Sequence, residues 1–99
     1  MGEIKESKVA IVTGAASGIG AALTRHLIDT NHLVLGVDIN SSKLNALSDD
    51  TGCATIVGDI AREEFNQSVA SHANEVFGRL DYVFLNAGIL GRYIEIQVT

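Results

Sequence analysis

A glycine-rich segment, Gly14-Ala-Ala-Ser-Gly-Ile-Gly20, separates a short apolar run from a helical pattern. The run, Val9–Val12, has the length and flanks of a strand that is buried on both faces. After the glycines, Ile19, Leu23 and Leu27 recur at steps of four, which predicts a helix over about 18–29. The glycines therefore mark a tight turn from a strand into a helix.

The same alternation continues along the chain. A second, short helix can be capped by Asn40, Ser41 or Ser42 and stopped at Gly52, and a longer helical pattern covers about 62–77. Three more short apolar runs predict strands: Leu33–Val37, Ala54–Val57 and Asp81–Leu85. This order predicts an α/β fold with a parallel sheet of about four strands and right-handed crossover helices.

Composition narrows the classes of partner. With 99 residues, 46% of them hydrophobic, the chain can hold one small core. A net charge of -5 without a basic cluster argues against nucleic acid and anionic membranes as partners. One cysteine and three scattered histidines give no metal-ligand spacing, and no apolar stretch is long enough to span a membrane. The absence of a targeting signal favours a cytoplasmic location.

The position of the glycines suggests what they could bind. Backbone amides and the positive end of the following helix can hold a pyrophosphate at this turn. Gly18 leaves room for phosphates to approach the backbone, and Gly20 allows the helix to pack closely on the sheet. The spacing, G-x-x-x-G-x-G, differs from the usual dinucleotide fingerprint G-x-G-x-x-G. A plain strand-to-helix turn is the alternative for the glycines taken alone.

Four segments together resemble a known family. Thr13-Gly14-x-x-x-Gly18-Ile19-Gly20 is similar to the cofactor signature of the short-chain dehydrogenases/reductases. Asp38, Asp59-Ile60 and Asn86-Ala87-Gly88-Ile89 follow the second, third and fourth predicted strands, where that family places cofactor contacts. The resemblance runs from about Lys8 to Ile89, and it implies a Rossmann-type fold. One departure is Leu85, where many members have a second asparagine.

The resemblance implies a set of cofactor-binding residues. Ser17, Gly18 and Ile19 would meet ribose and pyrophosphate, Asp59-Ile60 the adenine, and Asn86-Ala87-Gly88 the ribose near the switch point of the sheet. The full set is Gly14, Ser17, Gly18, Ile19, Gly20, Asp38, Asp59, Ile60, Asn86, Ala87 and Gly88. Some of these residues have a simpler alternative: Asp38 and Asp59 as polar strand ends or helix caps, and Asn86-Ala87-Gly88 as an ordinary turn.

Asp38 bears on the choice of cofactor. A carboxylate at the end of the second strand can accept both adenosine ribose hydroxyls, but it repels a 2′-phosphate. Ala15 and Ala16 supply no cation for such a phosphate. NAD is therefore predicted in preference to NADP.

The chemistry of the family requires residues that this sequence lacks. Members transfer hydride with a serine and a Tyr-x-x-x-Lys pair beyond the fourth strand, whereas Tyr93 is followed four places on by Gln97. No catalytic residue is assigned. We expect residues 1–89 to be an NAD(P)-binding half-domain and 90–99 a divergent tail. The chain would then be a truncated alcohol/carbonyl oxidoreductase that binds NAD(H) and is inactive alone. The alternative is a non-catalytic dinucleotide-binding or subunit-interaction module.

The tail raises a structural question. Ile94, Ile96 and Val98 alternate with polar residues, which predicts a half-buried strand. If Tyr82–Leu85 is left as an uncovered edge, aggregation or homo-oligomerisation through it is expected. The competing hypothesis is that Tyr93–Val98 folds back antiparallel and covers this edge.

Overall fold

The computed structural model describes residues 7–87 and 92–97. Strands and helices alternate as the sequence predicts, and one more strand follows. The elements are β1 (Val9–Thr13), α1 (Gly18–Asp29), β2 (Leu33–Asp38), α2 (Ser41–Thr51), β3 (Ala54–Val57), α3 (Glu63–Phe77), β4 (Tyr82–Ala87) and β5 (Arg92–Gln97).

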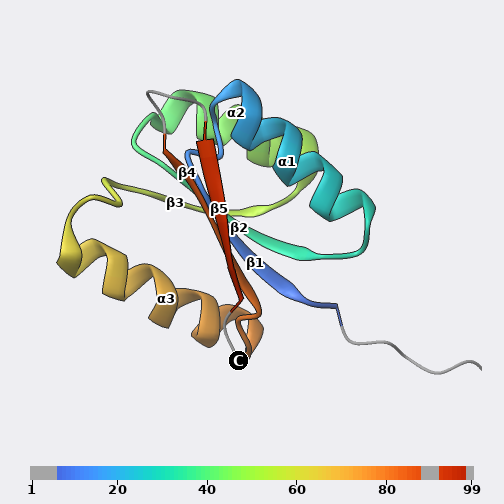
Figure 1. Cartoon of the computed structure of the whole chain (residues 1–99). Helices are drawn as coiled ribbons and strands as arrows, with labels where there is room; N and C mark the ends of the chain where they lie inside the picture. Colours follow the sequence, from blue (N-terminus) through green and yellow to red (C-terminus); the bar gives the residue numbers. More distant parts are fainter. Residues whose placement is uncertain (1–6, 88–91, 98–99) are drawn as a thin grey trace, which may run out of the picture.

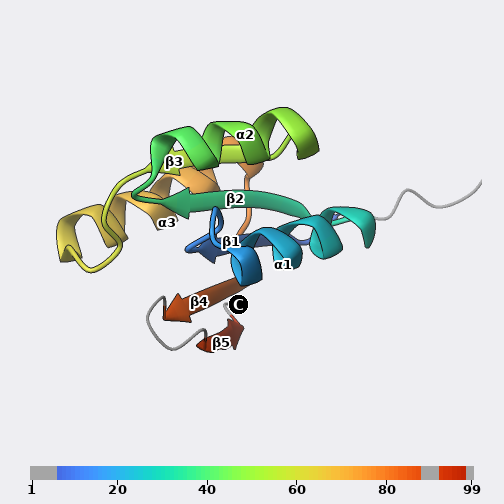
Figure 2. The ribbon, with the colours of Figure 1, turned by 90° about the horizontal axis from the view of Figure 1, so that it is seen from above.

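The five strands form one sheet in the order β3-β2-β1-β4-β5 (Figures 1 and 2). Three of the four strand pairings are parallel: Ile11 of β1 is paired with Leu35 of β2 on one side and with Val83 of β4 on the other. All residues of β1 are buried. The carboxyl ends of the parallel strands therefore meet at one edge of the sheet.

Helices cover both faces, with α1 and α2 on one side of the sheet and α3 on the other (Figure 1). Successive residues of a strand point to opposite faces. Ala10 and Val12 of β1 accordingly pack with Leu27 of α1 and Leu44 of α2, whereas Ile11 packs with Val69 of α3. The apolar runs are continuous because each strand serves two cores. The Rossmann-type parallel sheet expected from the sequence is confirmed.

Side chains cap the starts of α1 and α2. Ser17 caps α1 by accepting a hydrogen bond from the Gly20 amide, and Asn40 caps α2 by accepting one from Lys43. Asn40 is thus the cap among the three candidates. Helix α3 begins at Glu63, one residue later than the sequence pattern suggests. None of the helices in the described part of the chain is both long and apolar enough to span a bilayer.

The tail pairs with β4, which corrects the expectation of an exposed fourth strand. Strand β5 runs antiparallel to β4 from the Ala87–Arg92 pair to the Tyr82–Gln97 pair. The backbone of β4 is therefore hydrogen-bonded on both sides, by β1 and by β5. The fold-back hypothesis is confirmed over 93–97, and Arg92 pairs as well, while Val98 lies outside the described residues. The outer strands of the described sheet are β3 and β5.

Candidate functional site

The glycine-rich turn after β1 forms a compact loop, here called the phosphate loop (14–17). Gly14 has φ +64°, a left-handed conformation that glycine adopts without strain. Its carbonyl accepts hydrogen bonds from the Ser17 amide at 3.1 Å and from the Ser17 hydroxyl at 2.7 Å. The Ser17 hydroxyl oxygen in turn accepts from the Gly20 amide at 3.2 Å. The loop thus leads directly into the positive end of α1.

The other two glycines of the motif have different surroundings. A Cβ at Gly20 would overlap the carbonyl of Gly14, so this position needs glycine for close packing of α1 against the turn that leaves β1. The predicted close contact exists, but with this turn and not with the sheet. A Cβ at Gly18 would meet nothing within 4 Å. Gly18 therefore leaves open space at the helix start, which is where a phosphate would approach.

Asp38 connects the phosphate loop to the turn after β2. Its Oδ2 accepts a hydrogen bond from the Ala16 amide at 3.0 Å, and its Oδ1 accepts one from the Asn40 amide at 2.9 Å. The loop is also held to β2 by a bond from the Ala15 amide to the Val37 carbonyl at 3.0 Å. Asp38 therefore does act as a strand-end carboxylate that accepts hydrogen bonds from nearby backbone amides, as the alternative interpretation states.

Asn86 holds the phosphate loop from the side of β4. Its Nδ2 donates to the Ser17 hydroxyl at 2.8 Å and, more weakly, to the Gly14 carbonyl at 3.4 Å. Its backbone amide donates to the Thr13 hydroxyl at 3.0 Å. The side chain is 8% exposed, and its Oδ1 is buried without a hydrogen-bond partner. Asn86 therefore presents an unused acceptor, and it is more than the turn residue of the alternative interpretation.

These residues surround a cavity of about 310 Å³, here called the carboxyl-end cavity. Six of the predicted residues line it together with three others that the sequence analysis missed. The lining is Gly14, Ser17, Val37, Asp38, Ile39, Gly58, Asp59, Ile60 and Asn86. The cavity lies outside the carboxyl ends of the parallel strands, beside β1, where ligands bind in open α/β sheets.

The remaining predicted residues do not line this cavity. Gly18 and Ile19 are exposed in the first turn of α1, next to Ser17, whereas Gly20 is buried. Ala87 ends β4 after Asn86, and Gly88 lies outside the described residues. The structure therefore brings residues from all four parallel strands together and places Gly18 and Ile19 beside them.

Gly36 is a further contributor that the sequence analysis missed. It lies within β2, and a Cβ there would meet the Cβ of Ala15 at 3.1 Å. Glycine inside a strand often marks a close approach of another segment, and this signal was available in the sequence. Here the approaching segment is the phosphate loop. Ile39 and Val37 carry no comparable signal, because their position depends on how the strand end turns.

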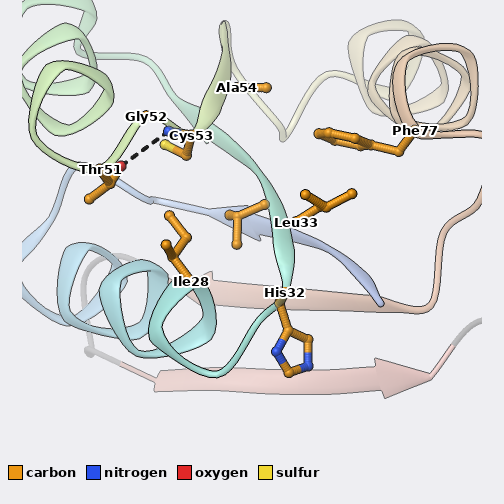
Figure 3. Close-up of a pocket in the computed structure, with 9 residues that line it drawn as sticks. Ile28, His32, Leu33, Thr51, Gly52, Cys53, Ala54 and Phe77 are labelled. Atoms are coloured by element: carbon orange, nitrogen blue, oxygen red, sulfur yellow. Dashed lines mark hydrogen bonds between the residues drawn. The ribbon is translucent and has the colours of Figure 1, made fainter. Parts of the chain in front are cut away.

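A second cavity, of about 200 Å³, lies at the opposite edge of the sheet, where β2 and β3 begin (Figure 3). Ile28 of α1 and Phe77 of α3 approach it from the two faces, and Cys53 and Leu33 lie between them. No Asp, Glu, Lys or Arg side chain lines it among the described residues. Cys53 is 7% exposed and packs in the apolar core. The described residues also contain no group of His, Cys, Asp and Glu that could hold a metal.

Two groups with shifted pKa values, Asp81 and Lys8, also lie at this opposite edge of the sheet. Arg79 donates two hydrogen bonds to Asp81, at 2.8 and 2.7 Å, and the Val9 amide donates a third at 2.8 Å. The Arg79 guanidinium, followed by the Val9 amide, lowers the pKa of the Asp81 carboxyl. A hydrogen bond to Tyr82 raises the pKa of Lys8. These contacts join β1 to β4 and are structural, because they lie far from the carboxyl-end cavity.

Comparison with known proteins agrees with this arrangement. The profile of the short chain dehydrogenase family matches residues 8–98. L-fucose dehydrogenase of Mus musculus is 38% identical over 82 residues, which are 82% of this chain and 30% of that protein. A (+)-cis,cis-nepetalactol synthase of Nepeta racemosa is 38% identical over 89 residues, 86% of this chain and 33% of the relative. The chain thus spans about a third of the length of these relatives.

Solved structures show the same fold. A 3-ketoacyl-(acyl-carrier-protein) reductase from Brucella melitensis, complexed with NADH, aligns with a TM-score of 0.74 at 26% identity, over 79% of this chain and 33% of that one. A short chain dehydrogenase from Bacillus anthracis aligns with a TM-score of 0.77 at 24% identity, over 83% and 35% of the two chains. The resemblance inferred from the four motifs is confirmed: the chain belongs to the short chain dehydrogenase family.

Proposed function

We propose that this chain binds NAD(H) in the carboxyl-end cavity. The observation that carries the proposal is the convergence of Gly14, Ser17, Asp38, Asp59, Ile60 and Asn86 on one cavity, although they stand up to 72 positions apart. The family and its reductase neighbour that is complexed with NADH support a dinucleotide ligand. Asp59, whose Oδ1 accepts a hydrogen bond from the Ala61 amide, and Ile60 would flank the adenine.

The local chemistry fits a pyrophosphate and a ribose. The amides of the phosphate loop and the start of α1 provide donors and a positive dipole end for phosphate oxygens. The orphaned Oδ1 of Asn86 is a buried acceptor, and such a group costs about 1–3 kcal/mol when no donor reaches it. A ribose hydroxyl of the cofactor could supply that donor and offset the cost. The residues present therefore suit the group that the family implies.

Asp38 favours NAD over NADP within this proposal. Its two oxygens each accept one backbone hydrogen bond, and an ionised carboxylate has about four acceptor sites, so two sites remain for the ribose diol. A 2′-phosphate at the same place would meet a negative charge. None of the described residues lining the cavity is Lys or Arg, so nothing there offsets the repulsion.

The reaction class belongs to the proposal as well. NAD(H) supplies a hydride acceptor or donor, and relatives such as the L-fucose dehydrogenases suggest oxidation of an alcohol or reduction of a carbonyl by the whole protein. We expect no turnover from these 99 residues alone, because Tyr93 lacks a lysine four places on. Division into a cofactor half (1–89) and a tail (90–99), and a cytoplasmic location, remain parts of the proposal.

The alternative, a module that pairs with another subunit, now depends on a different strand. Strand β4 is flanked by β1 and β5, so only the outer side of β5 is available at that end of the described sheet. Light scattering tests this alternative, because concentration-dependent self-association would favour it and a monomer would count against it.

The deciding experiment for NAD(H) binding is a titration of the chain with NADH and NADPH, followed by nicotinamide fluorescence and by amide NMR shifts. Saturable NADH binding that perturbs the amides of 14–20 supports the proposal, and weaker NADPH binding supports the role of Asp38. Equal affinity for the two cofactors would remove the Asp38 argument. Absence of binding by either would overturn the proposed function.

A further inference from the structure

Asp38 joins two segments that the sheet alone does not connect. Ala16 lies in the phosphate loop, 22 positions before Asp38, and Asn40 is the residue that caps α2. One carboxylate accepts from both backbone amides, at 3.0 and 2.9 Å. Hydrogen bonds from backbone amides to a carboxylate are charge-assisted and stronger than neutral ones.

The phosphate loop is held from both sides by side chains of the strands that flank β1. Asp38, at the end of β2, binds the Ala16 amide, and Asn86, in β4, binds the Ser17 hydroxyl and the Gly14 carbonyl. Strands β2 and β4 are the two neighbours of β1 in the sheet. Without the Asp38 carboxylate, the bond from the Ala15 amide to the Val37 carbonyl still holds the loop to β2, but the Ala16 amide loses its acceptor. Geometry at a binding site depends on such support.

We propose that Asp38 is a positioning residue for the phosphate loop, so that pyrophosphate binding depends on it even when the ligand has no ribose hydroxyl for it to accept. This inference rests on the proposed NAD(H) site, and it adds a second role to the residue that selects the cofactor. It follows that loss of the carboxylate does not simply open the site to NADP, because the loop that both cofactors need is loosened at the same time.

The two roles of Asp38 predict different effects of its removal on the affinity for a nucleotide that has no ribose hydroxyl. The analogue 2′,3′-dideoxy-ADP carries a pyrophosphate but no ribose hydroxyl. If Asp38 only received the ribose, Asp38→Ala would leave the affinity for this analogue unchanged or raise it, because a negative charge near the phosphates is lost. If Asp38 positions the loop, the affinity falls.

We therefore compare ADP and 2′,3′-dideoxy-ADP by calorimetric or NMR titration of the unsubstituted chain, Asp38→Ala and Asp38→Asn. The Asp38→Ala variant is expected to lose about tenfold in affinity for the dideoxy analogue, as befits one charge-assisted hydrogen bond. Asp38→Asn keeps one side-chain acceptor and is expected to recover part of that loss. Unchanged or tighter binding of the dideoxy analogue to Asp38→Ala would overturn the proposal.

Hydrogen exchange supplies a test without any ligand. In Asp38→Ala the Ala16 amide should exchange faster than in the unsubstituted chain, while amides of β1 keep their protection. Asp59→Ala is the matched control, because it removes a carboxylate of the same cavity that accepts a hydrogen bond from the Ala61 amide and not from the phosphate loop, which lies wholly in the described part of the chain. An Ala16 amide that exchanges at the same rate in both variants would contradict the positioning role.

The two tests distinguish failure of the proposed function from failure of this inference. If the unsubstituted chain binds neither nucleotide, the proposed function fails, while the exchange rates still decide whether Asp38 holds the loop.

Discussion

The side-chain amide of Asn86 donates a hydrogen bond to the hydroxyl of Ser17 over 2.8 Å, although the two residues stand 69 positions apart. Ser17 caps α1, so this bond ties the start of that helix to β4. Asn86→Ala removes it together with the weaker bond to Gly14. We expect a loss of about 1–3 kcal/mol in the free energy of unfolding, measured by urea denaturation, and weaker NADH binding.

Asn66 provides the matched control for this substitution. It lies on the exposed side of α3, and its Nδ2 donates to the Ile60 carbonyl at the long distance of 3.5 Å. Asn66→Ala should change stability by no more than about 0.5 kcal/mol. Equal losses in the two variants would mean that the contact between Asn86 and Ser17 contributes nothing specific.

Two glycines of the same motif should respond in opposite ways to one methyl group. Gly20→Ala places a Cβ on the Gly14 carbonyl, so we expect overpacking to cost about 1–3 kcal/mol of stability or more. Gly18→Ala meets open space, so stability should be kept or slightly raised, because alanine is a better helix former. Its Cβ would instead occupy the approach to the helix start, and NADH affinity should fall by about tenfold or more.

Urea denaturation and NADH titration of both variants separate these effects. Gly20→Ala is expected to lower the free energy of unfolding, whereas Gly18→Ala is expected to lower only the affinity for NADH. A Gly18→Ala variant that binds NADH as tightly as the unsubstituted chain would show that the phosphates do not approach the helix start at this position.

Much of this arrangement follows from the sequence for identifiable reasons. Each parallel strand is a continuous apolar run because it contacts a core on both faces, and such runs are visible without a structure. Asp38, Asp59 and Asn86 each follow such a run. The carboxyl ends of parallel strands share one edge of the sheet, so their convergence on one cavity was predictable.

Other features depend on information that residue types do not carry. The Ala16 amide has no sequence signature as a donor to Asp38, because every residue except proline has such an amide. The alternation in the tail predicts a strand and the neighbouring edge predicts its partner, but neither fixes the register. Pairing begins at Ala87 and Arg92, one residue earlier in the tail than expected.

Acid should weaken the fold through Asp81. The contacts from Arg79 and Val9 lower the pKa of its carboxyl in the folded state below the ordinary value of 3.8. A lowered pKa stabilises the fold fully above the ordinary value, and this contribution is lost as pH falls from there through the folded-state pKa. We expect Asp81→Asn to be less stable than the unsubstituted chain at pH 7, and the difference to shrink below about pH 4.

Urea denaturation of both chains between neutral and acid pH measures this difference. Asp50→Asn is the control, since Asp50 pairs with Arg25 in an exposed ion pair at 2.9 Å, a kind of contact that contributes about 0–1 kcal/mol. A stability difference between the unsubstituted chain and Asp81→Asn that stays constant down to the lowest pH would show that the Asp81 carboxylate is not the titrating group.

Strand β5 should protect the sheet from self-association. In the described structure its backbone pairs along the whole of β4, from Ala87 to Tyr82. A chain that ends after Gly91 leaves the amides and carbonyls on that side of β4 unpaired, and an exposed apolar strand edge is a template for pairing with another chain. We expect the shortened chain to self-associate, so that at equal concentration it scatters more light per unit mass than the unshortened chain.

Hydrogen exchange locates the effect. Faster exchange at Val83 or Leu85 in any remaining monomer would place it at β4. If the shortened chain is instead as monomeric and as protected as the longer one, β5 is not what shields this edge.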